Sequence, residues 1–248
     1  MKALITGASS WIGRDMARYM SKLGYDLVLV SRNEEELYNL KDELQTQVEV
    51  IALDLSKKEN CYKVYDRAKD IDILINNAGF GVFGKFVETD LEKEIDLIQT
   101  NITAVHILTK LYLKDMVKNN KGHILNVASI AGFMPGPLMA AYYASKNYVV
   151  NLTRAINKEL RKSKSNVKMS LLCPGPVNTN FNNVANVNFK VKALSSEYVA
   201  KYAVDRMLKG KLLIVPGKLI KVAKIMAKIS PTSMVEEVSY HMQVSKGK

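Results

Sequence analysis

Three side chains in the middle of the chain have the types and spacing of an acid–base site. Ser129 follows an apolar run, Tyr142 comes thirteen residues later, and Lys146 follows Tyr142 at a spacing of four. That spacing places Tyr142 and Lys146 on one face of a helix. A phenol with a pKa near 10 is a poor base at neutral pH, but an adjacent ammonium favours its phenolate. We therefore expect Tyr142 to move a proton while Ser129 donates a hydrogen bond to a substrate oxygen.

The spacing of Tyr142 and Lys146 carries weight only through its context. Tyr65 and Lys69 form a second pair with the same spacing, but only Tyr142 follows a serine at an expected strand end. Tyr143 is an alternative acid, although its fourth successor is Asn147 and not a lysine. Catalysis at Tyr142 is thus preferred over the alternative of an ordinary half-buried tyrosine.

A glycine loop near the N-terminus predicts a phosphate-binding turn. Residues 6–13 read TGASSWIG and lie between an apolar run and a helical segment that opens at Arg14. Such a loop directs free backbone N–H groups and the positive helix end at a phosphate, and an ordinary strand-to-helix turn is the alternative. Trp11 stands where the usual pattern has a glycine, so either the loop has moved or the indole packs beside the cofactor. The predicted cofactor contacts of this loop are Gly7, Ser9, Ser10, Trp11, Ile12 and Gly13.

The residues after the second apolar run favour NADP(H) over NAD(H). The segment 30–33 reads VSRN and has no carboxylate where an acid would bind the ribose 2′-hydroxyl of NAD. Arg32 can hold a 2′-phosphate by paired charge-assisted hydrogen bonds. The alternative is a solvent-facing arginine at a strand end.

Seven short apolar runs alternate with longer segments of helical period, the pattern of repeated βαβ units. The predicted strands are Ala3–Thr6, Leu27–Val30, Val48–Leu53, Ile71–Asn76, His123–Ala128, Val167–Cys173 and Leu212–Val215. Because these runs are apolar on both faces, helices must cover both sides of the sheet. We expect an α/β fold, a single Rossmann-type, doubly wound sheet of seven parallel strands in three layers. Further candidate contacts follow the third and fourth strands at Asp54, Leu55, Asn77, Ala78 and Gly79.

Taken together, residues 6–13, Asn76–Gly79, Ser129, Tyr142, Lys146 and Pro174–Gly175 resemble the short-chain dehydrogenase/reductase family, over residues 2 to about 217. The resemblance implies the strand order 3-2-1-4-5-6-7, a nicotinamide cofactor and a homodimer or homotetramer. It also implies that Asn101 completes the catalytic set, that Asp54 lies beside the adenine, and that Thr179 lies near the nicotinamide amide. Tyr142, Lys146, Pro174, Gly175 and Val177 are the other cofactor contacts it suggests. The expected reaction interconverts a carbonyl and an alcohol, because hydride transfer requires a proton exchange at the oxygen.

Composition narrows the classes of protein that remain. The 248 residues are 48% hydrophobic and 24% charged, which predicts one globular domain. The net charge of +12 comes without nucleic-acid-binding signatures, so we expect no nucleic-acid partner. Cys61 and Cys173 lie far apart with no metal-ligand spacing, so we expect no metal site. The apolar start is too short for a signal peptide, and the cytoplasm is the expected compartment.

The last 31 residues, 218–248, are predicted to form a basic amphipathic extension on a Rossmann domain that spans 1–217. Four lysines lie in one sector of the helix predicted over 218–229, and apolar residues fill most of the rest. Packing on the same domain or on a partner subunit is favoured over contact with a membrane surface. A non-catalytic nucleotide-binding redox sensor and a peripheral membrane protein are the alternative functions.

The predicted substrate pocket is apolar and suits an uncharged, lipid-like carbonyl compound. Its walls are expected from the segments after Gly79, Ser129 and Thr179. The candidate wall residues are Phe80, Val82, Phe83, Ile130, Phe133, Met134, Pro135 and Phe181. The residues around 178–193 have no clear period and are predicted to form a loop.

Overall fold

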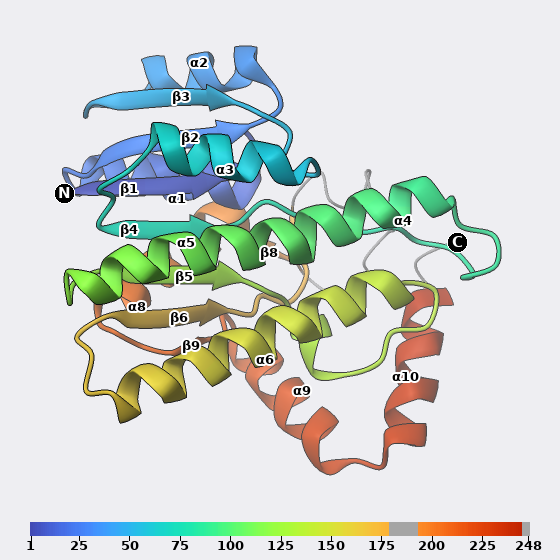
Figure 1. Cartoon of the computed structure of the whole chain (residues 1–248). Coiled ribbons are helices and arrows are strands. Elements are labelled where there is room, and N and C mark those ends of the chain that lie inside the picture. The colour runs from blue at the N-terminus through green and yellow to red at the C-terminus, as the bar shows by residue number, and fades with distance from the viewer. Residues whose placement is uncertain (179–192, 245–248) are drawn as a thin grey trace.

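The chain folds around one parallel seven-stranded sheet (Figure 1). The computed structural model describes residues 1–178 and 193–244. The strand order is β3-β2-β1-β4-β5-β6-β9, which confirms the expected order because β9 is the seventh strand of this sheet. The strands are β1 (Lys2–Thr6), β2 (Asp26–Ser31), β3 (Val48–Ala52), β4 (Ile73–Asn76), β5 (His123–Val127), β6 (Lys168–Leu172) and β9 (Leu213–Ile214). Each strand lies within two residues of its predicted bounds.

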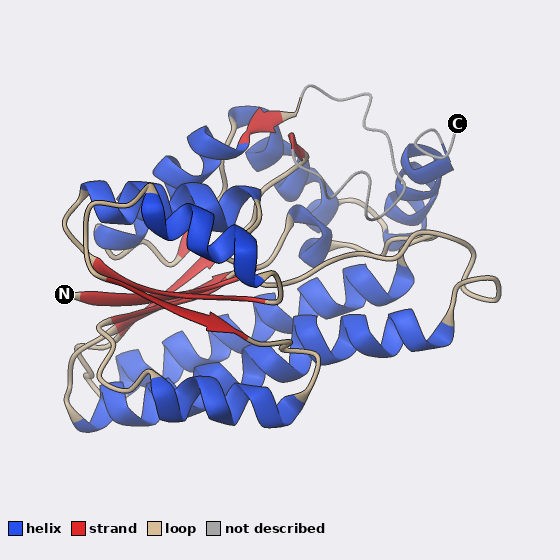
Figure 2. Cartoon of the chain, turned by 90° about the horizontal axis from the view of Figure 1, so that it is seen from above, coloured by secondary structure: helices blue, strands red, loops and turns tan. Residues whose placement is uncertain are grey.

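Helices cover both faces of the sheet, as Figure 2 shows from above. On one face lie α1 (Trp11–Lys22), α2 (Glu34–Asp42) and α8 (Ser196–Leu208). On the other lie α3 (Lys58–Arg67), α5 (Val105–Lys118) and α6 (Ala140–Lys162). Alternate residues of a strand serve the two layers: Ala3 and Ile5 of β1 pack toward α1, and Leu4 packs in the opposite core. The predicted three-layer Rossmann-type fold is confirmed.

Several short elements complete the edge of the sheet at which the strands end. Helix α4 (Leu91–Ile98) leads into a π-helical turn, η1 (Gln99–Ala104), which continues directly into α5. A 3₁₀ turn, η2 (Ile130–Phe133), follows β5. A separate parallel pair is formed by β7 (Val177–Asn178) and β8 (Leu194–Ser195). Most of the predicted loop over 178–193 lies outside the described residues.

The C-terminal extension consists of two helices and not one. Helix α9 (Lys218–Ile229) coincides with the predicted amphipathic helix, and α10 (Thr232–Val244) follows after Ser230 and Pro231. The two helices form a V at the lower right of Figure 1. In the described part of the chain, no helix has the length and apolar character that crossing a bilayer demands.

A buried histidine predicts acid sensitivity of the fold. His123 in β5 is bonded to the Ser170 hydroxyl at 2.9 Å, and burial, helped by Lys168, lowers its pKa from 6.5 to about 4. Between pH 6.5 and 4 the unfolded chain therefore binds a proton at His123 more readily than the folded chain does. The free energy of unfolding is highest with respect to this group above pH 6.5 and falls as the pH is lowered. We expect unfolding free energy to fall by about 2 kcal/mol from this residue between pH 7 and 4.5. Urea titrations of the wild type and of His123→Gln at about pH 7 and 4.5 measure this difference. An identical fall in unfolding free energy in the two proteins would contradict the prediction.

Candidate active site

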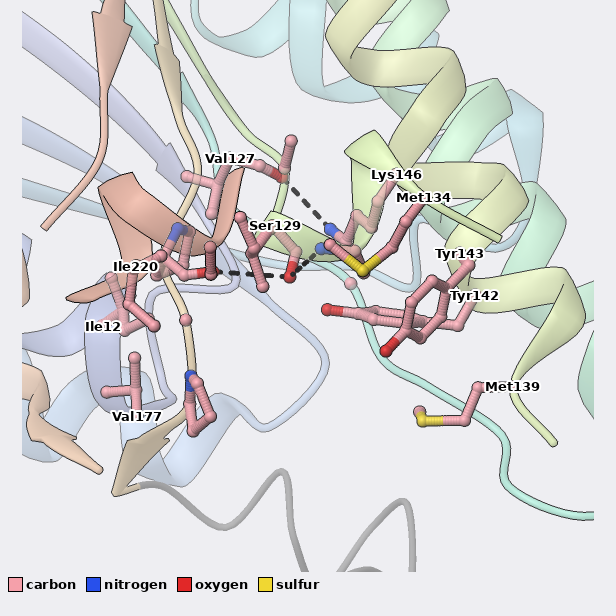
Figure 3. A pocket seen from close by; sticks show the side chains of 18 of the residues that line it. Ile12, Val127, Ser129, Met134, Met139, Tyr142, Tyr143, Lys146, Val177 and Ile220 are labelled. Atoms are coloured by element: carbon pink, nitrogen blue, oxygen red, sulfur yellow. Dashed lines mark hydrogen bonds between the residues drawn. The ribbon is translucent and has the colours of Figure 1, made fainter. Parts of the chain in front are cut away.

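Ser129, Tyr142 and Lys146 converge on one cavity, as the close view in Figure 3 shows. Ser129 follows β5 and starts η2, while Tyr142 and Lys146 lie one turn apart on α6. The Ser129 hydroxyl is hydrogen-bonded to the Tyr142 hydroxyl and also accepts a bond from the Ala131 N–H at 3.2 Å. The Lys146 ammonium lies 5.8 Å from the centre of the Tyr142 ring and donates to the Val127 carbonyl at 3.1 Å. The parallel sheet and the long helix α6 thus bring together three residues that the sequence separates.

The protonation of Tyr142 differs from the expectation of a readily formed phenolate. Burial raises the pKa of Tyr142, and the hydrogen bond with Ser129 lowers it by less. Burial also lowers the pKa of Lys146 to about 8. The expectation was wrong because both groups lie in a dry environment, which disfavours the charged form of each. Tyr142 is therefore a neutral phenol at pH 7 and can give a proton away.

Asn101 lies one layer behind the cavity, in the π-helical turn. Its side-chain oxygen accepts the Phe80 N–H at 3.0 Å, and its amide nitrogen donates to the Phe80 carbonyl at 2.9 Å and to the Ser145 hydroxyl at 3.1 Å. A Cβ at Gly79 would come within 2.8 Å of the Asn101 Oδ1 and 3.2 Å of the Lys146 Nζ. Asn101 and Lys146 therefore flank the backbone of Gly79, and only a glycine lets them come this close.

The glycine loop leaves the start of α1 open toward the cavity. The N-cap residue Ser10 makes no side-chain cap bond, and the first turn holds no acidic residue. A Cβ at Gly13 would lie 2.3 Å from the Gly7 carbonyl oxygen, so the loop closes tightly on itself. The Asn77 side chain donates to the carbonyls of Thr6 and Gly7, both at 3.1 Å. These features give the free N–H groups and the positive helix end that bind a phosphate.

Trp11 lies at the wall of the cavity without filling it. Its backbone φ is +23°, on the positive side that favours glycine, and its side chain remains 46% exposed. The loop has not moved away, since Ser9, Ser10 and Ile12 line the same cavity. Trp11 lines this cavity as well, and its contact with a cofactor stays a prediction.

The other predicted cofactor residues lie along the same edge of the sheet, some in the cavity lining and some outside it. Arg32 is exposed directly after β2. Asp54 follows the neighbouring β3, where its carboxylate accepts the Ser56 N–H at 2.9 Å, and Leu55 beside it is buried. Ala78 packs against the core, while Pro174, Gly175 and Val177 line the cavity. Thr179 lies outside the described residues.

The cavity has a volume of about 870 Å³ and is largely apolar. Of the predicted substrate wall, Phe80, Ile130 and Met134 line it. Phe83 and Phe133 instead pack in neighbouring clusters, Val82 and Pro135 do not reach the lining, and Phe181 lies outside the described residues. The prediction was wrong for those four described residues because an apolar loop residue can equally pack beneath the loop.

The sequence analysis missed the wall that α9 and α10 provide. The lining includes Ile220 and Ala223 of α9 and Met234, Val238 and Met242 of α10. The i, i+4, i+8 spacing of those three residues in α10 was the available signal. Helix α10 is attached to the domain by polar contacts: Gln243 donates to the Tyr143 hydroxyl at 2.6 Å, and Ser239 is hydrogen-bonded to the same hydroxyl.

A sequence model of the short chain dehydrogenase family matches residues 1–189. The chain belongs to the short-chain dehydrogenase/reductase family. Mouse estradiol 17-beta-dehydrogenase 11 is 32% identical over 249 residues, which cover 97% of this chain and 83% of the mouse protein. Residues 6–13, Ser129, Tyr142 and Lys146 thus lie in a member of the family that their pattern suggests.

Two solved structures show the same fold with different cofactors. A short-chain dehydrogenase from Sphingobium yanoikuyae in complex with NADPH has a TM-score of 0.81 and 29% identity, covering 93% of this chain and 96% of that one. A short-chain dehydrogenase/reductase from Burkholderia phymatum in complex with NAD has a TM-score of 0.83 and 26% identity, covering 91% and 92%. This short-chain dehydrogenase/reductase therefore has a fold that binds nicotinamide cofactors, and the choice between the two depends on its own residues.

Proposed function

We propose that this short-chain dehydrogenase/reductase interconverts a carbonyl and an alcohol on an apolar compound, with NADP(H) as cofactor. The observation that carries the proposal is the convergence of a neutral, partly buried Tyr142, a hydrogen-bonded Ser129 and the Lys146 ammonium on one apolar cavity. The residues present fit the cofactor, because the open start of α1 and the Gly7–Gly13 contact form a cradle that a Cβ would fill. When bound, the nicotinamide supplies or accepts the hydride.

The chain's own residues handle the substrate oxygen. In the reductive direction the Tyr142 hydroxyl gives its proton to that oxygen, and in the oxidative direction it takes the proton back. The Ser129 hydroxyl donates a hydrogen bond to the same oxygen as negative charge develops there. The Lys146 ammonium stabilises the Tyr142 oxygen after the proton has left. Asn101 fixes the backbone at Phe80, which keeps this side of the cavity in place.

The cavity supports an apolar substrate. Aromatic, aliphatic and methionine side chains provide most of its wall, from Phe80 and Met134 at one side to Val238 and Met242 at the other. Such a surface gains free energy by covering apolar area and offers few partners to a charged sugar or phosphate. A panel of aldehydes and ketones of rising chain length, assayed by NADPH oxidation, tests the proposal. We expect kcat/KM to rise with chain length, and absence of turnover across the panel would refute the activity.

Arg32 is proposed to select NADP(H). It is exposed at the end of β2, beside the neighbouring strand end that carries Asp54. Replacing Arg32 by alanine removes a charge-assisted contact with the 2′-phosphate, so we expect the Kd for NADPH to rise about 10-fold to 100-fold while that for NADH changes little. Fluorescence titration with both cofactors measures the effect, and Arg161→Ala at the end of α6 is the matched control. An equal change for both cofactors would show that Arg32 does not read the 2′-phosphate.

The alternative of a non-catalytic nucleotide sensor depends on Trp11 disabling the site. The half-exposed indole leaves the space beside Ser129 and Tyr142 open, so no observation favours that alternative over catalysis.

A further inference from the structure

Helix α9 carries an apolar stripe that the fold leaves uncovered. None of its twelve residues is buried. Leu219, Val222, Ile225, Met226 and Ile229 recur at spacings of three and four and are between 52% and 69% exposed. Isolated apolar residues are normal on a protein surface, but a continuous stripe of five on one short helix marks an interaction site.

Lysines border this stripe without acidic partners. Lys218, Lys221, Lys224 and Lys228 are the only charged residues of α9. In the described part of the chain, none of the four has a carboxylate within ion-pair distance. Lys221 approaches the Tyr202 hydroxyl at 3.4 Å and Lys224 lies 5.7 Å from the Phe133 ring centre, so these two lie where the helix meets the domain. The free charge of α9 is therefore positive only.

We propose that α9 docks on the surface of an anionic phospholipid bilayer. The apolar stripe enters the boundary between headgroups and acyl chains, and the lysines contact the anionic headgroups, which is how a basic amphipathic helix lies in a membrane interface. A second copy of the chain fits this surface less well. A two-fold contact between two α9 helices would bring lysines of both copies together with no carboxylate on α9 to pair with them.

Two residues of the apolar stripe on α9 also belong to the lining of the cavity. Leu219 and Met226 belong to the exposed stripe and also line the cavity. The apolar lining of the cavity thus continues onto the surface that meets the lipid, and α9 and α10 stand out from the domain as a V (Figure 1). An apolar compound dissolved in the bilayer reaches the cavity along this surface without crossing water. The docking itself does not depend on catalysis, so it can fail or hold independently of the proposed function.

Co-sedimentation of the full chain with vesicles tests the docking. Vesicles of phosphatidylcholine containing about 30% phosphatidylglycerol are compared with pure phosphatidylcholine vesicles at physiological salt. The charge variant combines Lys218→Gln, Lys221→Gln and Lys228→Gln, and the stripe variant combines Ile225→Gln and Ile229→Gln. The matched charge control changes Lys158, Lys162 and Lys211, three exposed lysines outside α9, to glutamine. Thermal unfolding of each variant verifies that it is folded.

We expect the wild type and the control to bind the anionic vesicles, and the charge variant to partition about 100-fold more weakly. The stripe variant should lose binding to a similar degree, because its helix cannot enter the interface. Absence of wild-type binding would overturn the proposal. Equal binding by wild type and both α9 variants would also overturn it, since another surface would then hold the lipid. A change of oligomeric state in the α9 variants without any vesicle binding would assign the stripe to a second copy of the chain.

Discussion

Tyr142→Phe is expected to lower kcat by about 10³-fold while leaving the Kd for NADPH almost unchanged. The variant removes one oxygen, the only atom of this side chain that can exchange a proton with the substrate, and keeps the ring that packs beside Lys146. The neighbouring Ser129 hydroxyl can still polarise the substrate oxygen, but it does not replace a proton donor. Steady-state kinetics on the best substrate of the chain-length panel, together with a cofactor titration, measures both quantities.

Tyr143→Phe is the matched comparison for this prediction. Its hydroxyl oxygen accepts a hydrogen bond from Gln243 and is also hydrogen-bonded to Ser239, so α10 holds this oxygen, whereas the Tyr142 hydroxyl is hydrogen-bonded to Ser129. We expect its change to appear mainly in KM, because α10 forms a wall of the cavity. If Tyr143→Phe lost more kcat than Tyr142→Phe, the acid would have been assigned to the wrong tyrosine.

Gly79→Ala is expected to reduce kcat/KM by about 100-fold through a single added methyl group. The added Cβ would lie 2.8 Å from the Asn101 Oδ1 and 3.2 Å from the Lys146 Nζ. Asn101 cannot retreat, since it is fully buried and held by three hydrogen bonds. Lys146 must then leave the Val127 carbonyl and its place beside Tyr142. Kinetics on the variant and its thermal unfolding midpoint record the damage.

Gly24→Ala separates site damage from backbone strain. Gly24 has φ +83°, and a Cβ there would meet nothing within 4 Å. We expect it to cost about 1–2 kcal/mol of stability through the left-handed backbone alone, with kcat/KM preserved. Gly79→Ala should instead lower kcat/KM more than stability, because Gly79 does not have a positive φ and the added methyl group causes only the clash. Unchanged kinetics in Gly79→Ala would mean that Asn101 and Lys146 need not lie this close.

The sequence was informative wherever a residue's role depends on its own strand or helix. The apolar runs fixed the strands, and the spacing of Tyr142 and Lys146 placed both side chains on one face of α6. Properties that depend on how several elements pack around a residue were harder to predict. The pKa of Tyr142 is raised because the surrounding elements bury it, which no local pattern reports. The apolar face of α10 reads the same whether it covers a core or lines a cavity, so its part in the site became visible only in three dimensions.

The contacts that attach α10 to the domain predict that a molecule bound in the cavity stabilises this helix. The buried residues of this helix are Ser239 and Gln243, whereas Met234, Val238 and Met242 face the cavity and remain about half exposed or more. Polar bonds of this kind can be exchanged for bonds to water at little cost. An apolar molecule in the cavity supplies the hydrophobic contact that α10 lacks, so ligand and helix cover each other. Amide hydrogen exchange in α10 should therefore slow when an apolar compound occupies the cavity. While it is bound, the compound provides the apolar packing that α10 does not obtain from the protein itself.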